Sequence, residues 1–125
     1  MGPGLVKLIL LEDDPLILLC TQDALAEAGF EVLPAISGAE ALALLADSPD
    51  CAVMMLDVRL ADPMDGWEVA RRARSLQPHI AIIYTTTADS PAYDRECVPQ
   101  SILLQKPYSL DRAVSVARKA CQMVE

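Results

Sequence analysis

The sequence predicts an α/β protein in which a doubly wound parallel sheet of five strands is flanked by five helices. Five short apolar runs alternate along the chain with five segments of helical character. Parallel neighbours need a covering crossover between them, so this alternation favours a parallel sheet with helices on both faces. The run over residues 51–56 is apolar without alternation, which is typical of a central strand buried on both faces.

The first strand and the first helix are expected within residues 5–28. Leu5 to Leu11 is an apolar run, and Asp14-Pro15 then supplies an N-cap followed by a proline at the first helical position. We expect this helix to reach Ala28, because Gly29 is a suitable C′ residue.

The second strand is expected over residues 31–35, and a second helix follows it. Ser37 and Glu40 have the spacing of a capping box, which marks the start of that helix. The third strand, residues 51–57, begins after Pro49-Asp50 and stops on an acid.

The second half of the chain continues the same alternation. A helix begins at Trp67, a β-branched strand spans residues 80–85, and Ser90-Pro91 opens a short helix. A fifth strand spans residues 101–104. Ser109 then caps a final helix whose apolar residues recur at helical spacing.

Composition favours one compact cytoplasmic domain. The chain has 125 residues, 53% of them hydrophobic, and a mean hydropathy of +0.29. We expect residues 1–125 to form one domain, with residues 1–4 as a flexible N-terminal extension. The net charge of -8 disfavours binding to nucleic acid. No apolar run approaches the roughly 18 residues that span a bilayer, so no membrane partner is expected.

The four cysteines are expected to be buried free thiols. Cys20, Cys51, Cys97 and Cys121 lack Cys-x-x-Cys spacing, and three of them lie in apolar patterns. This arrangement argues against a disulfide framework or a zinc site. The single histidine, His79, is expected in an exposed loop.

Acidic, hydroxyl and basic residues lie where the expected strands end. They are Glu12 and Asp13 after the first strand, Asp57 at the end of the third, Thr85 and Thr86 at the end of the fourth, and Lys106 after the fifth. In doubly wound sheets the ligand site lies outside the carboxyl ends of the strands, so these residues predict one site. Crowded carboxylates favour a hard divalent cation, and Mg2+ with a phosphoryl group suits an open acidic site.

Five motifs give the chain a resemblance to the receiver domains of response regulators. They are Glu12-Asp13-Asp14-Pro15, Leu56-Asp57, Met64-Asp65-Gly66, the threonines after Ile83-Tyr84, and Lys106-Pro107-Tyr108. Each motif is weak alone, but they occur in order and at the separations typical of the family, over essentially the whole chain. The resemblance implies a flavodoxin-like sheet with strand order 2-1-3-4-5.

The resemblance implies that the chain is a phosphoacceptor in a two-component pathway. Asp57 would take a phosphoryl group from the phosphohistidine of a histidine kinase and form an acyl phosphate. Lys106 would pair with Asp57 and then with the phosphoryl oxygens. Thr86 is our first choice for the hydroxyl contact and Thr85 the second, because counting from Ala81 places Thr86 at the usual strand end.

The resemblance also implies a Mg2+ site. Asp13 and Asp57 would be direct ligands, Glu12 would act through water, and the backbone carbonyl of Arg59 would complete the site. The chain would then be a signalling switch rather than an enzyme, catalysing only its own phosphorylation and dephosphorylation.

Two groups of partners follow from this interpretation. A sensor histidine kinase or a phosphotransfer protein would supply the phosphoryl group, and Leu16 or Leu18 on the first helix are candidate anchors for its helix pair. An unidentified downstream protein would bind the switched surface, and a homodimer is a further option.

Three residues depart from the common receiver pattern. Thr87 follows the hydroxyl residue where a small residue is usual, and Leu103 stands where many members carry an aromatic switch residue. Arg59 lies in a loop one residue longer than the commonest form, and we expect it to alter the lifetime of the acyl phosphate. Tyr84, expected to be half-buried, or Tyr108 would have to replace the aromatic switch.

Two other functions compete with the phosphoacceptor. A Mg2+-dependent phosphohydrolase with an aspartyl nucleophile typically has a second acid two residues after that nucleophile, where this chain has Arg59. A binding module that does not depend on phosphorylation would retain the fold but not the phosphoacceptor function. The complete set of acids, threonine and lysine argues against that module.

Overall fold

The computed structural model describes residues 5–87 and 92–123, in which strands and helices alternate. The strands are β1 (Val6–Leu11), β2 (Phe30–Ala35), β3 (Val53–Asp57), β4 (Ala81–Thr86) and β5 (Ser101–Gln105). The helices are α1 (Pro15–Glu27), α2 (Gly38–Asp47), α3 (Gly66–Leu76), α4 (Ala92–Glu96) and α5 (Leu110–Gln122). The expected helix start at Ser90-Pro91 and the expected extension over residues 1–4 lie outside the described residues.

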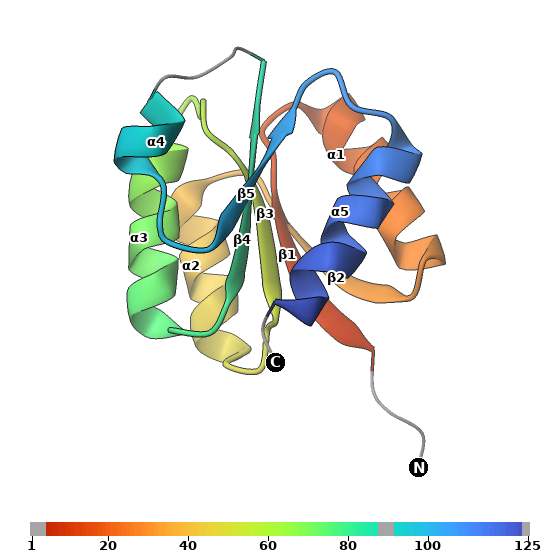
Figure 1. Cartoon of the computed structure of the whole chain (residues 1–125), viewed down its shortest axis with the longest axis horizontal. Coiled ribbons are helices and arrows are strands. Elements are labelled where there is room, and N and C mark those ends of the chain that lie inside the picture. The colour runs from red at the N-terminus through yellow and green to blue at the C-terminus, as the bar shows by residue number, and fades with distance from the viewer. Residues whose placement is uncertain (1–4, 88–91, 124–125) are drawn as a thin grey trace.

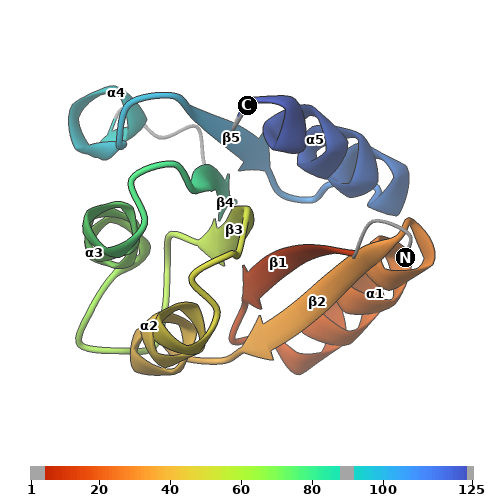
Figure 2. The same ribbon diagram turned by 90° about the horizontal axis from the view of Figure 1, so that it is seen from below.

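The five strands form one parallel sheet in the order β2-β1-β3-β4-β5, as predicted (Figure 1). Viewed from below, α1 and α5 cover one face of this sheet and α2, α3 and α4 cover the other (Figure 2). All strands point the same way, so their carboxyl ends and the N-termini of the helices that follow them meet at one edge.

Two apolar clusters, one on each face of the sheet, form the core. The cluster on the α2–α3–α4 side contains Met54 and Leu56 of β3, and the cluster on the α1–α5 side contains Val53 and Met55. All five β3 residues are buried. Successive β3 side chains enter the cores on opposite faces of the sheet, which explains why the strand has no polar face.

Side chains cap the helices that begin at the carboxyl edge of the sheet. Asp14 accepts hydrogen bonds from the backbone of α1, Ser37 from α2, Asp65 from α3 and Ser109 from α5. These caps satisfy N–H groups that a first helical turn leaves without partners. Gly29 has φ of 101°, a left-handed conformation that favours glycine after a helix.

Three aromatic rings, one each from α3, β4 and α4, pack together. The Trp67 and Tyr84 ring centroids are 4.6 Å apart, and the Tyr84 ring meets the Tyr93 ring edge-on at 5.9 Å. Tyr84 is fully buried, so the expectation of half-burial is wrong. The Tyr84 hydroxyl accepts a hydrogen bond from Val98 N at 3.0 Å, and burial raises the pKa of Tyr84 to about 12.

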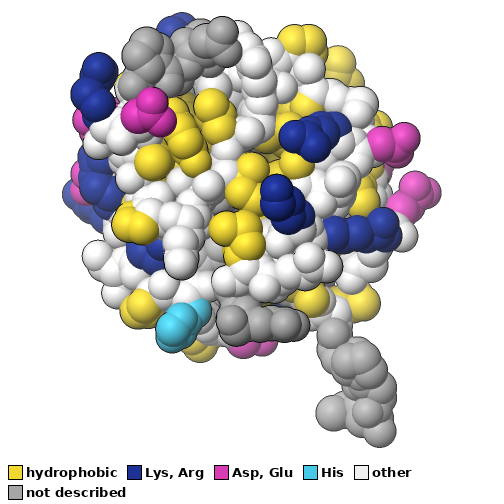
Figure 3. Space-filling view, in the orientation of Figure 1, with side chains coloured by type: hydrophobic (Ala, Val, Ile, Leu, Met, Phe, Trp, Pro, Cys, Tyr) yellow, Lys and Arg dark blue, Asp and Glu magenta, His cyan; other side chains and the backbone are white. Residues whose placement is uncertain are grey.

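The prediction about cysteines needs one correction. All four are free thiols, but only Cys51 is buried; Cys97 and Cys121 are partly buried and Cys20 is exposed. Cys20 is on α1 and remains exposed although its neighbours in sequence are apolar. His79 is exposed, as predicted, and is the cyan side chain in Figure 3. Within residues 5–87 and 92–123, no helix combines the length and apolar character needed to cross a membrane.

Candidate functional site

Three carboxylates meet at the carboxyl edge of the sheet because β1 and β3 are neighbours. Glu12 and Asp13 follow β1, and Asp57 is the last residue of β3. One carboxylate oxygen from each residue lies within 4.8 Å of the others. Glu12 and Asp57 are buried, whereas Asp13 is exposed. The strand-end acids predicted from the sequence therefore form one cluster, at the carboxyl ends of the buried strands β1 and β3.

Lys106, which follows β5, reaches across the edge of the sheet to two of these acids. Its Nζ donates to Glu12 Oε1 at 2.6 Å and to Asp57 Oδ2 at 3.0 Å. The Lys106 side chain is only 10% exposed, so both ion pairs are shielded from water. The other Glu12 oxygen accepts a hydrogen bond from Asp14 N at 3.1 Å.

Burial and charge shift the pKa values of this ion pair. Burial raises the pKa of Glu12, and the hydrogen bond from Lys106 offsets only part of that rise. Burial lowers the pKa of Lys106, but hydrogen bonds to Glu12 and Asp57 outweigh it and the pKa is raised overall. Lys106 is therefore held in its charged form between the two carboxylates.

Two buried threonines end β4 beside the cluster. Thr85 lies opposite Asp57 in the β3–β4 register, and Thr86 is the last residue of the strand. The Thr86 carbonyl accepts a hydrogen bond from Lys106 N at 2.7 Å. This bond ties the end of β4 to the lysine that contacts the acids.

The loop after β3 donates backbone N–H groups to two of the acids. Arg59 N donates to Asp57 Oδ1 at 3.0 Å, and Ala61 N donates to Asp13 Oδ2 at 2.9 Å. The Arg59 side chain is exposed. Both donors lower the electrostatic repulsion among the clustered carboxylates.

The donor set fits a hard divalent cation such as Mg2+. All three acidic side chains offer oxygen atoms, and these converge within 4.8 Å. Both oxygens of Glu12 already accept hydrogen bonds from the protein, which suits contact through water better than direct coordination. Asp13 is the most accessible of the three acids.

Comparison with known proteins decides the family. The family model of the response regulator receiver domain matches residues 8–118 of this chain. The chain belongs to this family. Receiver domains are the signalling phosphoacceptors of two-component systems.

Relatives and solved structures agree with this receiver assignment. The chain is 30% identical to the response regulator receiver protein CpdR of Brucella abortus, over 90% of this chain and 94% of the relative. It is 31% identical to the transcriptional regulatory protein TrcR of Mycobacterium tuberculosis, but spans only 44% of that relative's length. The crystal structure of a response regulator receiver protein from Sinorhizobium medicae superposes on this chain with a TM-score of 0.90 and is 30% identical to it. The match covers 97% of this chain and 98% of that one. The chemotaxis protein CheY4 of Vibrio cholerae has a TM-score of 0.86 with 26% identity, covering 94% and 99%.

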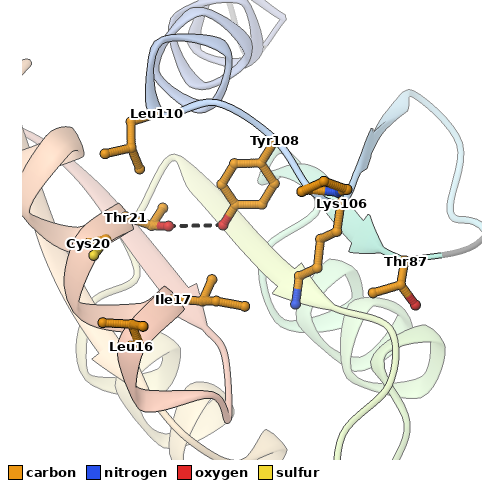
Figure 4. A pocket seen from close by; sticks show the side chains of 9 residues that line it. Leu16, Ile17, Cys20, Thr21, Thr87, Lys106, Tyr108 and Leu110 are labelled. Atoms are coloured by element: carbon orange, nitrogen blue, oxygen red, sulfur yellow. Dashed lines mark hydrogen bonds between the residues drawn. The ribbon is translucent and has the colours of Figure 1, made fainter.

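An apolar cavity of about 380 Å3 opens beside Lys106 in this receiver domain (Figure 4). It is lined by Leu16, Ile17, Cys20, Thr21, Thr87, Lys106, Pro107, Tyr108 and Leu110. The Tyr108 hydroxyl and Thr21 Oγ1 are 2.9 Å apart, so a hydrogen bond joins the segment after β5 to α1 across this cavity. Sequence reasoning missed this contact because it joins residues that are 87 positions apart.

The exposed residues of α1 differ in part from those expected. Leu16 is 69% exposed, as the sequence predicted. Leu18 is partly buried against the α1–α5 side of the core, whereas Leu19 is 57% exposed. The spacing of Leu18, Thr21 and Leu25 places these residues on one helical stripe, which is the signal that could have identified Leu18 as inward-facing.

Proposed function

We propose that Asp57 accepts a phosphoryl group from the phosphohistidine of a sensor histidine kinase or a phosphotransfer protein. The observation that carries this proposal is the position of Lys106 Nζ, within 3.0 Å of oxygens of both Asp57 and Glu12. An ammonium group held there can stabilise the negative charge that Asp57 gains when it accepts a phosphoryl group. The family membership and the convergence of three carboxylates support the same role.

In the proposed reaction, an Asp57 carboxylate oxygen attacks phosphorus. The new O–P bond forms as the P–N bond of the phosphohistidine breaks, and the imidazole leaves with the electron pair of that bond. Lys106 keeps its contact with Glu12 and donates to a phosphoryl oxygen. The product is an acyl phosphate on Asp57, and its hydrolysis returns the free carboxylate.

The metal site in this proposal comprises Asp13 and Asp57 as direct ligands, Glu12 through water, and the backbone carbonyl of Arg59. Bound Mg2+ would neutralise charge on the phosphoryl oxygens. The loop N–H groups that contact Asp57 and Asp13 support this assignment, because they orient the carboxylates from outside.

The proposal is tested by incubating the protein with Mg2+ and a small acyl or amido phosphate donor, followed by intact-mass measurement. Wild type should gain the mass of one phosphoryl group, and Asp57→Asn should gain none. Repeated turnover of phosphate esters by wild type would favour the phosphohydrolase instead. No gain in wild type, or equal gain in both proteins, would contradict the phosphoacceptor and favour a binding module.

We assign the hydroxyl contact to Thr86, with Thr85 as the second choice. The bond between the Thr86 carbonyl and Lys106 N supports this choice, because it fixes Thr86 relative to the proposed phosphoryl-binding ammonium. Thr86→Ala should slow phosphorylation by the small donor about fivefold, the value of one hydrogen bond of about 1 kcal/mol. Thr85→Ala is the matched control and should have a smaller effect. The reverse order of rates would transfer the role to Thr85.

Phosphorylation is proposed to shift an existing equilibrium between two forms of the surface around α4, β5 and α5. Figure 3 shows apolar side chains over this part of the molecule, and Ile102 and Leu103 of β5 are partly exposed. A downstream protein or a second copy of the chain would bind there. We also propose that residues 1–125 form one domain and act in the cytoplasm, where the four free thiols stay reduced.

The phosphoryl donor is proposed to dock on α1 beside the apolar cavity. Leu16 lines that cavity together with Lys106, and Leu16 and Leu19 are both exposed on α1. A helix pair carrying apolar residues could cover both leucines while presenting its histidine to Asp57.

Glutamate at these leucines should separate docking from chemistry. Leu16→Glu and Leu19→Glu should slow phosphotransfer from a purified histidine kinase about tenfold or more, because a charge replaces apolar contact area. Phosphorylation by the small donor should be unchanged. Leu76→Glu is the matched control, since Leu76 is 59% exposed at the far end of α3. Normal transfer to both α1 variants would contradict docking on this helix.

A further inference from the structure

The loop between β3 and α3 has a second attachment, away from the acids. Asp62 Oδ2 accepts a hydrogen bond from Gly38 N at 2.7 Å. Gly38 is the first residue of α2, so this N–H group is one that the helix cannot satisfy itself. The loop is therefore bound to the carboxylates by its own N–H groups and to α2 by its own carboxylate.

The Asp62 attachment joins the loop to a rigid part of the fold. A charge-assisted hydrogen bond to a helix N-terminus is stronger than a neutral one, and the helix dipole adds to it. Ala41 and Leu45 of α2 are almost completely buried. The same site is tightly packed, because a Cβ on Gly38 would lie 2.7 Å from Val69 Cγ2 and 3.2 Å from Asp62 Oδ2.

Of the three clustered acids, Asp13 depends most on this loop. Glu12 and Asp57 are buried and share Lys106, whereas Asp13 is exposed. Ala61 N donates to Asp13 Oδ2, and Ala61 immediately precedes Asp62 in the chain. Fixing Asp62 on α2 therefore fixes the direction of the N–H group that orients the Asp13 carboxylate.

We propose that Asp62 is a positioning residue for the divalent-cation site, acting through Ala61 N and Asp13. This inference rests on the proposed function, because it takes Asp13 as a metal ligand. Hydrogen-bonded partners behind a metal ligand set its orientation, and losing one typically weakens metal binding by 10–100-fold. Asp62 contributes this orientation from α2 without touching the metal.

The alternative is that Asp62 only caps α2. A cap alone would change the stability of the protein and leave its affinity for a cation unaltered. The two roles are separated by measuring cation affinity and thermal unfolding on the same variants.

The experiment measures the dissociation constant of Mn2+ from the paramagnetic resonance signal of the free ion, with wild type, Asp62→Ala, Asp62→Asn, Asp65→Asn and Asp13→Asn. Asp62→Ala should weaken Mn2+ binding about tenfold. Asp62→Asn keeps an oxygen acceptor for Gly38 N and should lie closer to wild type. Asp65→Asn removes one charge from the same loop and retains an N-cap for α3, so it should bind Mn2+ as wild type does.

The outcomes distinguish this inference from the proposed function. Asp62→Ala with wild-type affinity for Mn2+, whatever its melting temperature, would overturn the positioning role while leaving the metal site intact. An equal loss in Asp65→Asn would also overturn it, because the effect would then be one of charge alone. Equal binding by wild type and Asp13→Asn would overturn the proposed metal site and this inference with it.

Discussion

Lys106→Met should strongly slow phosphorylation of Asp57 and destabilise the protein by about 3 kcal/mol near neutral pH. The substitution keeps the aliphatic stem but leaves Glu12 and Asp57 buried without their ammonium partner. Removing one member of a buried ion pair is costly because the remaining charge has lost both water and its counter-charge. Denaturant unfolding and intact-mass measurement after exposure to a small phosphate donor test the two parts of this prediction.

The stability loss in Lys106→Met should depend on pH in a defined direction. Burial raises the pKa of Glu12, and without Lys106 the hydrogen bond that lowers it is gone. Between the unfolded value of about 4.3 and the raised folded value, the native state binds a proton that the unfolded state does not. Stability must then fall as pH rises through this window, so the deficit should be smaller near pH 5 than near pH 8. In wild type, the raised pKa of Lys106 means that its contribution is lost only in strongly alkaline solution.

Lys7→Met provides the matched control for this change. Lys7 also pairs with a carboxylate, Asp50, at 3.1 Å, but Asp50 is 67% exposed. Its removal should therefore change stability little, because an exposed pair is well solvated. Equal losses in the two variants, or a deficit in Lys106→Met that grows on acidification, would contradict the account of a buried, shared lysine.

Gly66→Ala should be the second strongly damaging change. A Cβ at Gly66 would collide with the backbone carbonyl oxygen of Asp57 and lie 2.6 Å from Val58 Cα. Gly66 N also donates to Val58 O at 2.9 Å, so α3 starts in direct contact with the end of β3. We expect a destabilisation of about 2 kcal/mol, within the usual range for overpacking, and slower phosphorylation because the Asp57 backbone must shift.

Gly38→Ala is the control for the Gly66 prediction. Its Cβ would meet side-chain atoms of Val69 and Asp62 rather than backbone, so these neighbours can move more easily. Denaturant midpoints and phosphorylation rates should therefore rank wild type above Gly38→Ala, and Gly38→Ala above Gly66→Ala. A wild-type phosphorylation rate in Gly66→Ala would show that the close contact does not position Asp57.

The sequence was sufficient to predict the sheet and the acid cluster, for the same physical reason. Parallel strands of alternating α/β units share one carboxyl edge, so a residue at a strand end can be placed without knowing side-chain contacts. Asp57, Glu12 and Lys106 lie together as the strand-end argument required. The helix caps at Asp14 and Ser109 were also predictable, because a cap depends on residues within one turn.

Contacts between distant loops were not predictable in this way. The bond between Asp62 and Gly38 joins a loop to the start of α2, two segments whose relative position depends on the whole fold, and no periodic pattern encodes it. The exposure of Cys20 and Leu19 depends on how α1 rotates against α5, which a helix that begins with six apolar residues leaves open. Tyr84 lies deeper than expected because Trp67 and Tyr93 cover its ring.

The packing of Trp67 against Tyr84 gives this receiver domain an intrinsic optical reporter. Trp67 is the single tryptophan of the chain, and its ring lies 4.6 Å from that of Tyr84, two residues before Thr86. Any movement of the end of β4 that accompanies modification of Asp57 must alter the surroundings of the indole. Emission from one unlabelled side chain can therefore follow the transition in real time, in the same solution in which the phosphate donor is added.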